Sequence, residues 1–159
     1  MPAKFNHTVE KGLKPLRPWT EWLFDINGDI DVYLDIYPVT KGHMLFVPKG
    51  FIENWDRSKT NAPEQILTYS SGNPWELIPE CMKQAYIQGN KMVQQGLCDG
   101  FNVGLNAGKA SGQTVAFPHV HLIPRRDGDM KDPAGGIRYC IPDRGNYHTS
   151  PHYSKTDES

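Results

Sequence analysis

The sequence lacks a strong charge imbalance, a cysteine framework and any long hydrophobic run. A formal net charge of −1 over 159 residues provides no overall basic field to recruit nucleic acid. The three cysteines, Cys81, Cys98 and Cys140, are too widely spaced for a disulfide framework or a CxxC metal motif. No stretch approaches the length of a transmembrane helix, and the first residues lack the apolar core of a secretory signal. We therefore expect a cytoplasmic protein that binds neither membranes nor nucleic acid.

The composition that is present fits one globular domain. Hydrophobic residues make up 38% of the chain and charged residues 22%, a balance typical of soluble domains with a real core. Residues 1–18 carry Lys, Pro and Gly without periodicity, which predicts an N-terminal arm. The main domain is expected over 19–126. A Gly- and Pro-rich C-terminal extension with a frayed polar tail, from residue 146, is expected over 127–159.

Hydrophobic patterning predicts a sheet and one long helix. Asn27-Gly28 indicates a turn, followed by an alternating strand over 30–36 and a buried strand over 44–47. Further strands are expected over 101–105 and over 115–123, the latter ended by Pro124. A short helix near 64–69 is also expected.

The long helix is expected over 74–97, with Asn73 as its cap, Pro74 in its first turn and Gly100 after its end. Its apolar face is predicted to contain Ile78, Met82, Ala85, Tyr86, Val93 and Leu97. The predicted fold class is α+β: an antiparallel sheet with one long helix packed on it.

Two of only six histidines lie one residue apart in the apolar stretch QTVAFPHVHLIPR (113–125). Side chains two apart on a strand share a face, which places His119 and His121 together with Phe117, with the two imidazoles roughly 6–7 Å apart along the chain. This spacing suits a phosphate group, which one imidazole could attack while the other holds an oxygen. Pro118 favours an edge, a bulge or a bend at this point.

The preceding loop also suits an anion. Gly108 and Gly112 allow backbone N–H groups to approach a ligand closely. Neutral donors come from Asn106, Ser111, Gln113 and Thr114, and Arg125 and Arg126 could offer forked donors to phosphate oxygens.

Two other interpretations of the paired histidines stay open from the residues alone. They could bind a metal with His43 as a third ligand, or they could be structural histidines with satisfied hydrogen bonds. The Gly/Ser loop could be an ordinary hairpin connection.

Three separated motifs resemble one family. DIYPVTKGHMLFVPK (35–49), GFNVGLNAGKASGQTV (100–115) and HVHLIPR (119–125) are similar to those of the histidine triad (HIT) nucleotide hydrolases and transferases, over roughly residues 28–126. The stretch GDMKDPAGGIRYCIPDRGNY (128–147) is similar to an extension of bacterial HIT hydrolases.

The resemblance implies a homodimer whose sheet continues across the two subunits, and attack by a histidine on the α-phosphate of a nucleotide. His119 matches the nucleophile that forms a nucleotidyl-histidine intermediate, and His121 matches a contact to phosphate and leaving group. Asp35 matches the position that holds ribose hydroxyls, and His43 has a supporting role. The phosphate-contacting positions are expected to be Asn106, Gly112, Gln113 and Thr114. Dinucleoside polyphosphates and nucleoside phosphoramidates with a purine base are the expected substrates, with no cofactor.

The chain departs from the family pattern at its first triad histidine, which is Phe117 here. The first alternative function is therefore a nucleotide-binding protein with weak or no catalysis. Phe117-Pro118-His119 is also similar to the His-Pro-His of the nucleotidyltransferase branch, so transfer is a second alternative, although His121 favours hydrolysis. No CxxC is present, so no structural zinc is expected. Arg138, in Gly135-Gly136-Ile137-Arg138, is expected to reach the active site, either in its own subunit or across the dimer.

Overall fold

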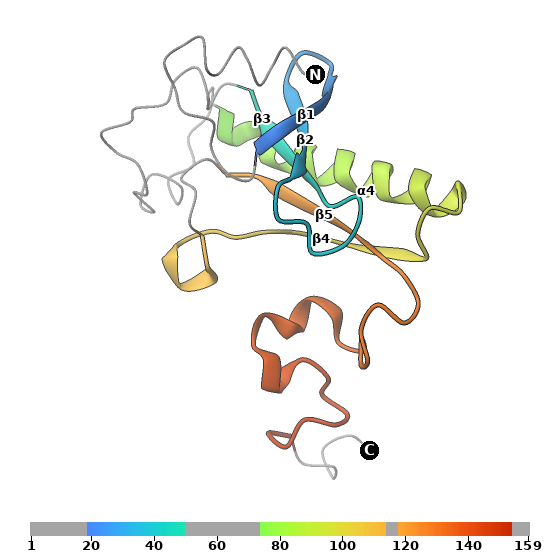
Figure 1. The fold of residues 1–159 in the computed structure, drawn as a ribbon. Coiled ribbons are helices and arrows are strands. Elements are labelled where there is room, and N and C mark those ends of the chain that lie inside the picture. Colours follow the sequence, from blue (N-terminus) through green and yellow to red (C-terminus); the bar gives the residue numbers. More distant parts are fainter. Residues whose placement is uncertain (1–18, 50–73, 114–117, 154–159) are drawn as a thin grey trace.

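A computed structural model describes residues 19–49, 74–113 and 118–153 of the chain. One antiparallel sheet has the strand order β1-β2-β3-β5-β4, and one long helix, α4, packs on one of its faces (Figure 1). The strands are β1 (Trp19–Ile26), β2 (Ile30–Asp35), β3 (Met44–Pro48), β4 (Gly100–Leu105) and β5 (Val120–Arg125). The predicted α+β class is confirmed, while the expected arm and the helix near 64–69 lie outside the described residues.

The first hairpin follows the sequence prediction. β1 and β2 pair from Ile26 and Ile30 outward, and the turn between them contains Asn27 with φ 52° and Gly28 with φ 76°. Positive φ at two central positions matches the right-handed twist of paired strands, which is why Asn-Gly is favoured there. Gly42, with φ 90°, similarly makes the predicted turn before β3.

The core lies between α4 (Ile78–Gln94) and the sheet. Ile30, Val32, Phe46, Val120 and Leu122 line the helix-facing side of the sheet and are fully buried. On the helix, Gly89 allows the ring of Phe101 to approach, because a Cβ there would lie 2.6 Å from that ring. The close contact fixes the edge strand β4 against α4.

The helix differs from its prediction at both ends and in its buried face. A 3-10 turn, η2 (Pro74–Leu77), precedes α4, and Gly96 with φ 74°, rather than Gly100, follows its end. The buried helix residues are Cys81, Ala85, Gly89 and Met92. Of the predicted apolar face, Met82, Tyr86, Val93 and Leu97 are exposed. Small residues bring the helix close to the sheet and so rotate the larger apolar side chains outward.

β5 begins and ends later than predicted. His119 lies immediately before its first residue, and Pro124 lies within it, paired with Phe101 of β4. β3 pairs with β5 only from Val120 to Leu122, so a residue without an amide hydrogen is tolerated beyond that point.

The face of the sheet that points away from α4 is called the open face here. Pairing places Trp22, Tyr33, Leu45, His121 and Gly104 in one row across all five strands. Paired residues point to the same side, and the core side is occupied by Val120 and Leu122, so this row belongs to the open face. The hydrogen bond from Asp35 N–H to the His43 carbonyl (3.0 Å) places those two residues side by side at the end of β2 and β3.

The C-terminal segment 127–153 contains the 3-10 turns η4 (Gly136–Cys140) and η5 (Pro142–Arg144) and lies on the side of the sheet away from α4 (Figure 1). Asp132 accepts hydrogen bonds from Tyr139 Oη and from Nδ2 of Asn146, which is buried. The first part of the predicted frayed tail, 146–153, is therefore tied back to the extension. Within the described ranges, no helix is long and apolar enough to cross a membrane.

Candidate active site

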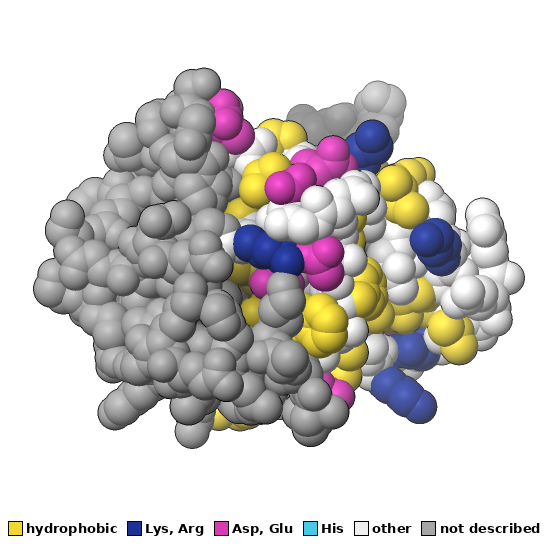
Figure 2. All heavy atoms as spheres, turned by 90° about the horizontal axis from the view of Figure 1, so that it is seen from above, with side chains coloured by type: hydrophobic (Ala, Val, Ile, Leu, Met, Phe, Trp, Pro, Cys, Tyr) yellow, Lys and Arg dark blue, Asp and Glu magenta, His cyan; other side chains and the backbone are white. Residues whose placement is uncertain are grey.

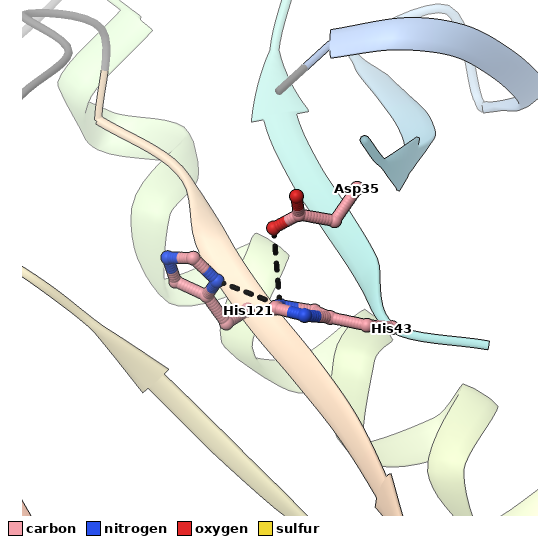
Figure 3. A group of neighbouring side chains, drawn as sticks. All are labelled: Asp35, His43 and His121. Atoms are coloured by element: carbon pink, nitrogen blue, oxygen red, sulfur yellow. Dashed lines mark hydrogen bonds and ion pairs between the residues drawn. The ribbon is translucent and has the colours of Figure 1, made fainter. Parts of the chain in front are cut away.

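His43 is the centre of a hydrogen-bonded group on the open face (Figure 3). Its Nδ1 accepts the backbone N–H of Val39 at 3.1 Å, so that nitrogen carries no proton. A neutral imidazole then carries its proton on Nε2, which lies 2.9 Å from Nδ1 of His121. His43 therefore donates to His121.

The bond from His43 fixes the second imidazole in turn. Since Nδ1 of His121 accepts, its proton is on Nε2, and this buried atom has no hydrogen-bond partner among the described residues. Buried donors are rarely left without a partner, so an unpaired one is a place to look for a ligand. The chain from Val39 to His43 to His121 thus ends in a donor N–H with a fixed orientation.

Both imidazoles are held neutral. Burial lowers the pKa of His121 to about 3, and the neighbouring His119 and His43 act in the same direction. Burial also lowers the pKa of His43, although the Asp35 carboxylate opposes this effect. Neutral rings agree with the single-proton assignments above.

His119 lies beside this pair. Its ring centroid is 4.9 Å from that of His121, which is itself 5.1 Å from that of His43. Three imidazoles therefore form a continuous row, of which the sequence spacing predicts only that His119 and His121 lie together. The side chain of His119 is partly exposed and so can be reached by a ligand.

The loop between β4 and β5 starts next to His119, because Leu105 pairs with Val120. Gly108 (φ 90°) and Gly112 (φ 89°) both adopt the positive φ that favours glycine, and η3 (Lys109–Ser111) lies between them. The Gly108 N–H donates to Oε1 of Gln113 at 2.7 Å, which closes the loop on itself. Asn106 is exposed at its start.

Asp35 is attached to the same group from β2. Its Oδ2 lies 3.4 Å from His43 Nε2, and its Oδ1 accepts the N–H of Tyr37 at 2.8 Å. Its side chain is only 7% exposed. The carboxylate is thus oriented by the backbone beside the imidazole pair.

Comparison with known proteins agrees with the geometry. Residues 27–128 match the model of the HIT domain. The chain belongs to the HIT family. A HIT-like protein of Methanocaldococcus jannaschii is 33% identical over 61% of this chain and 63% of its own length, so this chain matches less than two thirds of that relative. An AP-4-A phosphorylase of Mycobacterium tuberculosis is 28% identical over 80% of this chain and 67% of its own. A solved zinc-bound histidine triad family protein of Mycobacterium smegmatis has 28% identity and a TM-score of 0.51, covering 70% of this chain and 69% of its own.

The zinc in that HIT relative calls for a test of the residues present here. Ligand atoms of Asp35, His43 and His121 lie within 4.8 Å of one another. A metal would need the lone pair of His43 Nε2, but the Val39 N–H keeps the imidazole proton on that nitrogen. In this arrangement His43 and His121 do not fit a metal. Their contacts are those of a hydrogen-bond chain in which the Val39 N–H donates to His43 and His43 donates to His121.

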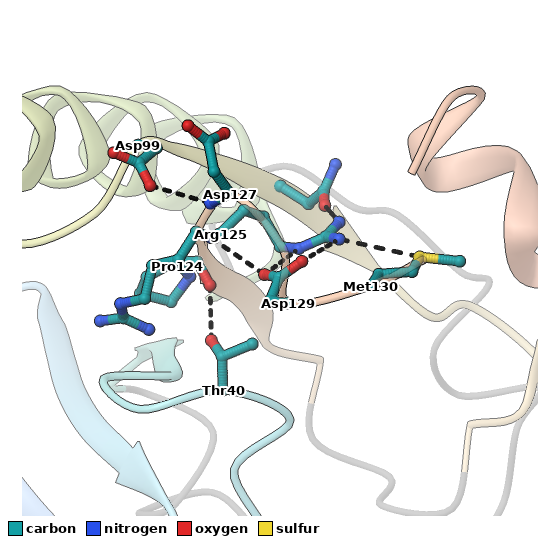
Figure 4. A network of polar contacts seen from close by, with 9 residues as sticks. Thr40, Asp99, Pro124, Arg125, Asp127, Asp129 and Met130 are labelled. Carbon is teal, nitrogen blue, oxygen red and sulfur yellow. Dashed lines mark hydrogen bonds and ion pairs between the residues drawn. The ribbon is translucent and has the colours of Figure 1, made fainter. Parts of the chain in front are cut away.

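The two arginines at the end of β5, Arg125 and Arg126, bind acceptors within the protein. Arg125 is bound by Asp129 through Nε and Nη2, both at 2.9 Å, and donates from Nη1 to Asn102 (Figure 4). Arg126 donates to the carbonyls of Leu97 and Lys41. Protein acceptors thus engage part of the donors of both arginines, and a contact of either one with phosphate stays a prediction.

Arg138 is also used within its own segment. Its guanidinium donates to the carbonyls of Gly145 and Arg144 and to Tyr153 Oη, and it lies 5.5 Å from the ring centroid of Tyr147. Within one subunit these contacts keep Arg138 in its own segment, and its role at an active site, its own or that of a partner subunit, stays a prediction. Thr114 and Phe117, a predicted phosphate contact and the replaced triad position, lie outside the described residues.

Sequence reasoning missed the residues that act through their backbone or through lack of a side chain. Val39 directs the His43 tautomer by its amide, for which no side-chain pattern exists. Gly104 leaves space beside His121 that is taken by Ile137, whose Cδ1 lies 3.3 Å from where a Gly104 Cβ would be. Strand pairing brings Gly104 to His121, and the turn between β2 and β3 brings the Val39 amide to His43.

Proposed function

We propose that this HIT protein is a nucleotide hydrolase that attacks an α-phosphate with His119. The observation that carries the proposal is the unpaired Nε2–H of His121, held by His43 and adjacent to the His119 ring. A nucleophile beside an oriented donor is the arrangement that phosphoryl transfer requires. Dinucleoside polyphosphates and nucleoside phosphoramidates with a purine base are the proposed substrates.

The proposed reaction has two steps. The unprotonated nitrogen of His119 forms a bond to phosphorus, and the electron pair of the breaking P–O bond leaves with the leaving group. The His121 N–H stabilises the charge that develops during this step. Water then attacks phosphorus, loses a proton to solvent and releases His119 with its electron pair.

Two features support substrate binding. Asp35 presents a buried, backbone-oriented carboxylate that can accept hydrogen bonds from two ribose hydroxyls. The loop with Asn106, Gly112 and Gln113 starts beside His119 and offers neutral groups to the phosphate. The loop carries one formal charge, that of Lys109, so it can bind phosphate largely through neutral groups and release the product more readily than a site with several ion pairs.

A second candidate function is transfer of the nucleotidyl group to phosphate. Pro118 before His119 and the relative named AP-4-A phosphorylase favour it. Both functions share the nucleotidyl-histidine and differ in what resolves it. A protein that binds nucleotides without turnover would form no such adduct.

One experiment tests the proposal. Wild-type protein is mixed with dinucleoside polyphosphate in excess chelator, quenched and analysed by mass spectrometry, with and without inorganic phosphate. We expect a nucleoside-monophosphate adduct on His119, none in His119→Ala, and a low residual rate in His121→Ala. Nucleoside monophosphate as the product would indicate hydrolysis, and nucleoside diphosphate formed only with phosphate would indicate transfer. Robust turnover by His119→Ala would refute both.

We also propose a homodimer formed through α4 and β4. Among the described strands, β4 pairs only with β5, so it is at the sheet edge and can continue the sheet into a second subunit. The outward face of α4 adds the exposed apolar side chains of Met82, Tyr86, Val93 and Leu97. Hydrophobic side chains are visible among polar ones in Figure 2, which views the molecule from above Figure 1.

A further inference from the structure

We infer that the groove between the β4–β5 edge and the C-terminal segment is the leaving-group subsite and that it receives the second nucleoside of a dinucleoside polyphosphate. The inference rests on the proposed function. It assigns a role to the C-terminal segment, which the catalytic residues do not use.

The direction follows from the strand order. Asp35, the proposed ribose contact, approaches His43 and His121 from the β2 and β3 side of the open face. The other neighbour of His121 in its row is Gly104 of β4. In an in-line displacement the leaving group departs opposite the attacking atom, here a nitrogen of His119. His119 lies just before the start of β5 and Arg125 lies at its end, so a leaving group that passes His121 is directed along β5 toward Arg125. With the first nucleoside on the β2 and β3 side near Asp35, the free side along this direction is that of β4.

Ile137 lies where a leaving group that departs past His121 would first meet the C-terminal segment. Its Cδ1 lies over Gly104, as close as 3.3 Å to the position of a Cβ there, and a larger residue at 104 would displace it. The side chain remains 64% exposed, which leaves an apolar surface over Gly104, the β4 partner of His121. An exposed isoleucine held beside a reactive row can contact a bound ligand.

The groove begins at Gly136, the residue before Ile137 in the chain, and extends past Asn102 of β4. It has a volume of about 500 Å³, and its lining includes Asn102, Arg125, Met130, Lys131, Pro133 and Gly136. Asn102 shares the face of Gly104, two residues along β4, and Gly136 approaches its amide. Arg125 lies four residues beyond His121, roughly 13 Å along the strand. A small leaving group such as ammonia would not extend to the groove, whereas a nucleoside polyphosphate would.

The residues that line the groove favour an uncharged ligand group over a further phosphate. Its three cationic residues, Arg125, Arg126 and Lys131, are balanced by Asp99, Asp127 and Asp129. The Asp129 carboxylate also forms paired bonds to Arg125. Met130 and Pro133 supply apolar surface, and the Asn102 amide can bond to a base edge. This chemistry suits a nucleoside.

A matched pair of substrates tests the inference. Diadenosine tetraphosphate and adenosine 5′-tetraphosphate share the attacked phosphate and differ in the second nucleoside. We expect the wild type to have the higher kcat/KM for the dinucleotide. Ile137→Ala and Asn102→Ala should lower the ratio of the two values by about five- to tenfold, the scale of a few lost pocket contacts. Ile141→Ala, exposed on the same segment but outside the groove lining, should leave the ratio unchanged.

The ratio does not depend on the fraction of folded protein, so partial unfolding of a variant cannot imitate the result. Equal wild-type kcat/KM for the two substrates, or an equal loss for both in the variants, would refute the subsite and leave the proposed function intact. No wild-type turnover of these two substrates or of a nucleoside phosphoramidate would refute the proposed function itself, and turnover of the phosphoramidate alone would refute only the subsite.

Discussion

The backbone N–H of Val39 donates a hydrogen bond to Nδ1 of His43. This contact decides which nitrogen of His43 carries the proton, and through His43 it decides the same for His121. A single amide in the turn after β2 therefore orients a donor on β5. The same contact also makes donation to His121 and metal binding alternatives for His43, because the tautomer that donates from Nε2 to His121 has no lone pair on Nε2 for a metal.

Removing the Val39 amide should weaken the hydrogen bond from His43 to His121 and allow His43 to bind a metal. In Val39→Pro the His43 proton can move to Nδ1, which exposes the Nε2 lone pair to Asp35 and His121. We expect activity to fall by about tenfold or more, the loss seen when a hydrogen bond that orients a metal-binding histidine is removed. We also expect zinc to inhibit this variant. Rates measured against added zinc, then chelator, test this. Val39→Ala keeps the amide and is the control; identical zinc responses in the two variants would contradict the assignment.

Acid should destabilise the fold through the same histidines. The pKa of His121 is lowered to about 3, and that of His43 is also lowered. Between a lowered folded pKa and the ordinary value near 6.5, the unfolded state binds the extra proton, so stability is complete above about pH 6.5 and falls as the pH drops toward 3. Each such histidine contributes a slope of up to about 1.4 kcal/mol per pH unit.

Thermal unfolding from pH 8 to pH 4 measures this slope. His121→Gln keeps a polar side chain but does not titrate, so its unfolding temperature should fall less steeply on acidification. A variant that loses stability as steeply as the wild type would show that other groups control the acid limb.

Asp35 should matter more for nucleotide affinity than for rate. Asp35→Ala removes a carboxylate proposed to accept two ribose hydroxyls, charge-assisted bonds worth on the order of 1.5–3 kcal/mol each. We expect KM to rise by at least about tenfold, with little further loss on a 2′,3′-dideoxy substrate. Because Oδ2 lies 3.4 Å from His43, a loss confined to kcat would instead indicate that Asp35 acts through that imidazole.

Elements with a local signal were predictable from the sequence. The Asn27-Gly28 turn, the alternating strand from Ile30 and the paired histidines each follow from residue type and spacing of 2. Glycine at 108 and 112 likewise takes the positive φ that its loop requires.

Features set by packing were not predictable. The helix buries Cys81 and Gly89 while Met82 and Tyr86 are exposed, and the Phe101 ring occupies the space at Gly89. Arg125 and Arg138 have the residue type of phosphate ligands, yet Asp129 and the Gly145 carbonyl hold them. Hydrogen-bond partners distant in the sequence, or on the backbone, leave no periodic signal.

The exposed α4 residues give the last prediction. The ring of Tyr86, 60% exposed, lies 5.6 Å from that of Phe101 on β4 and so joins the helix surface to the sheet edge. Aromatic residues at the centre of interfaces often contribute 2 kcal/mol or more. We expect a dimer at micromolar concentration, weakened by at least about thirtyfold in Tyr86→Glu, because a charge would be buried without a partner.

Ile141→Glu, at a similarly exposed apolar residue on the C-terminal segment, should not affect association. Sedimentation equilibrium measures both, and a wild-type monomer, or equal weakening by the two variants, would exclude this interface.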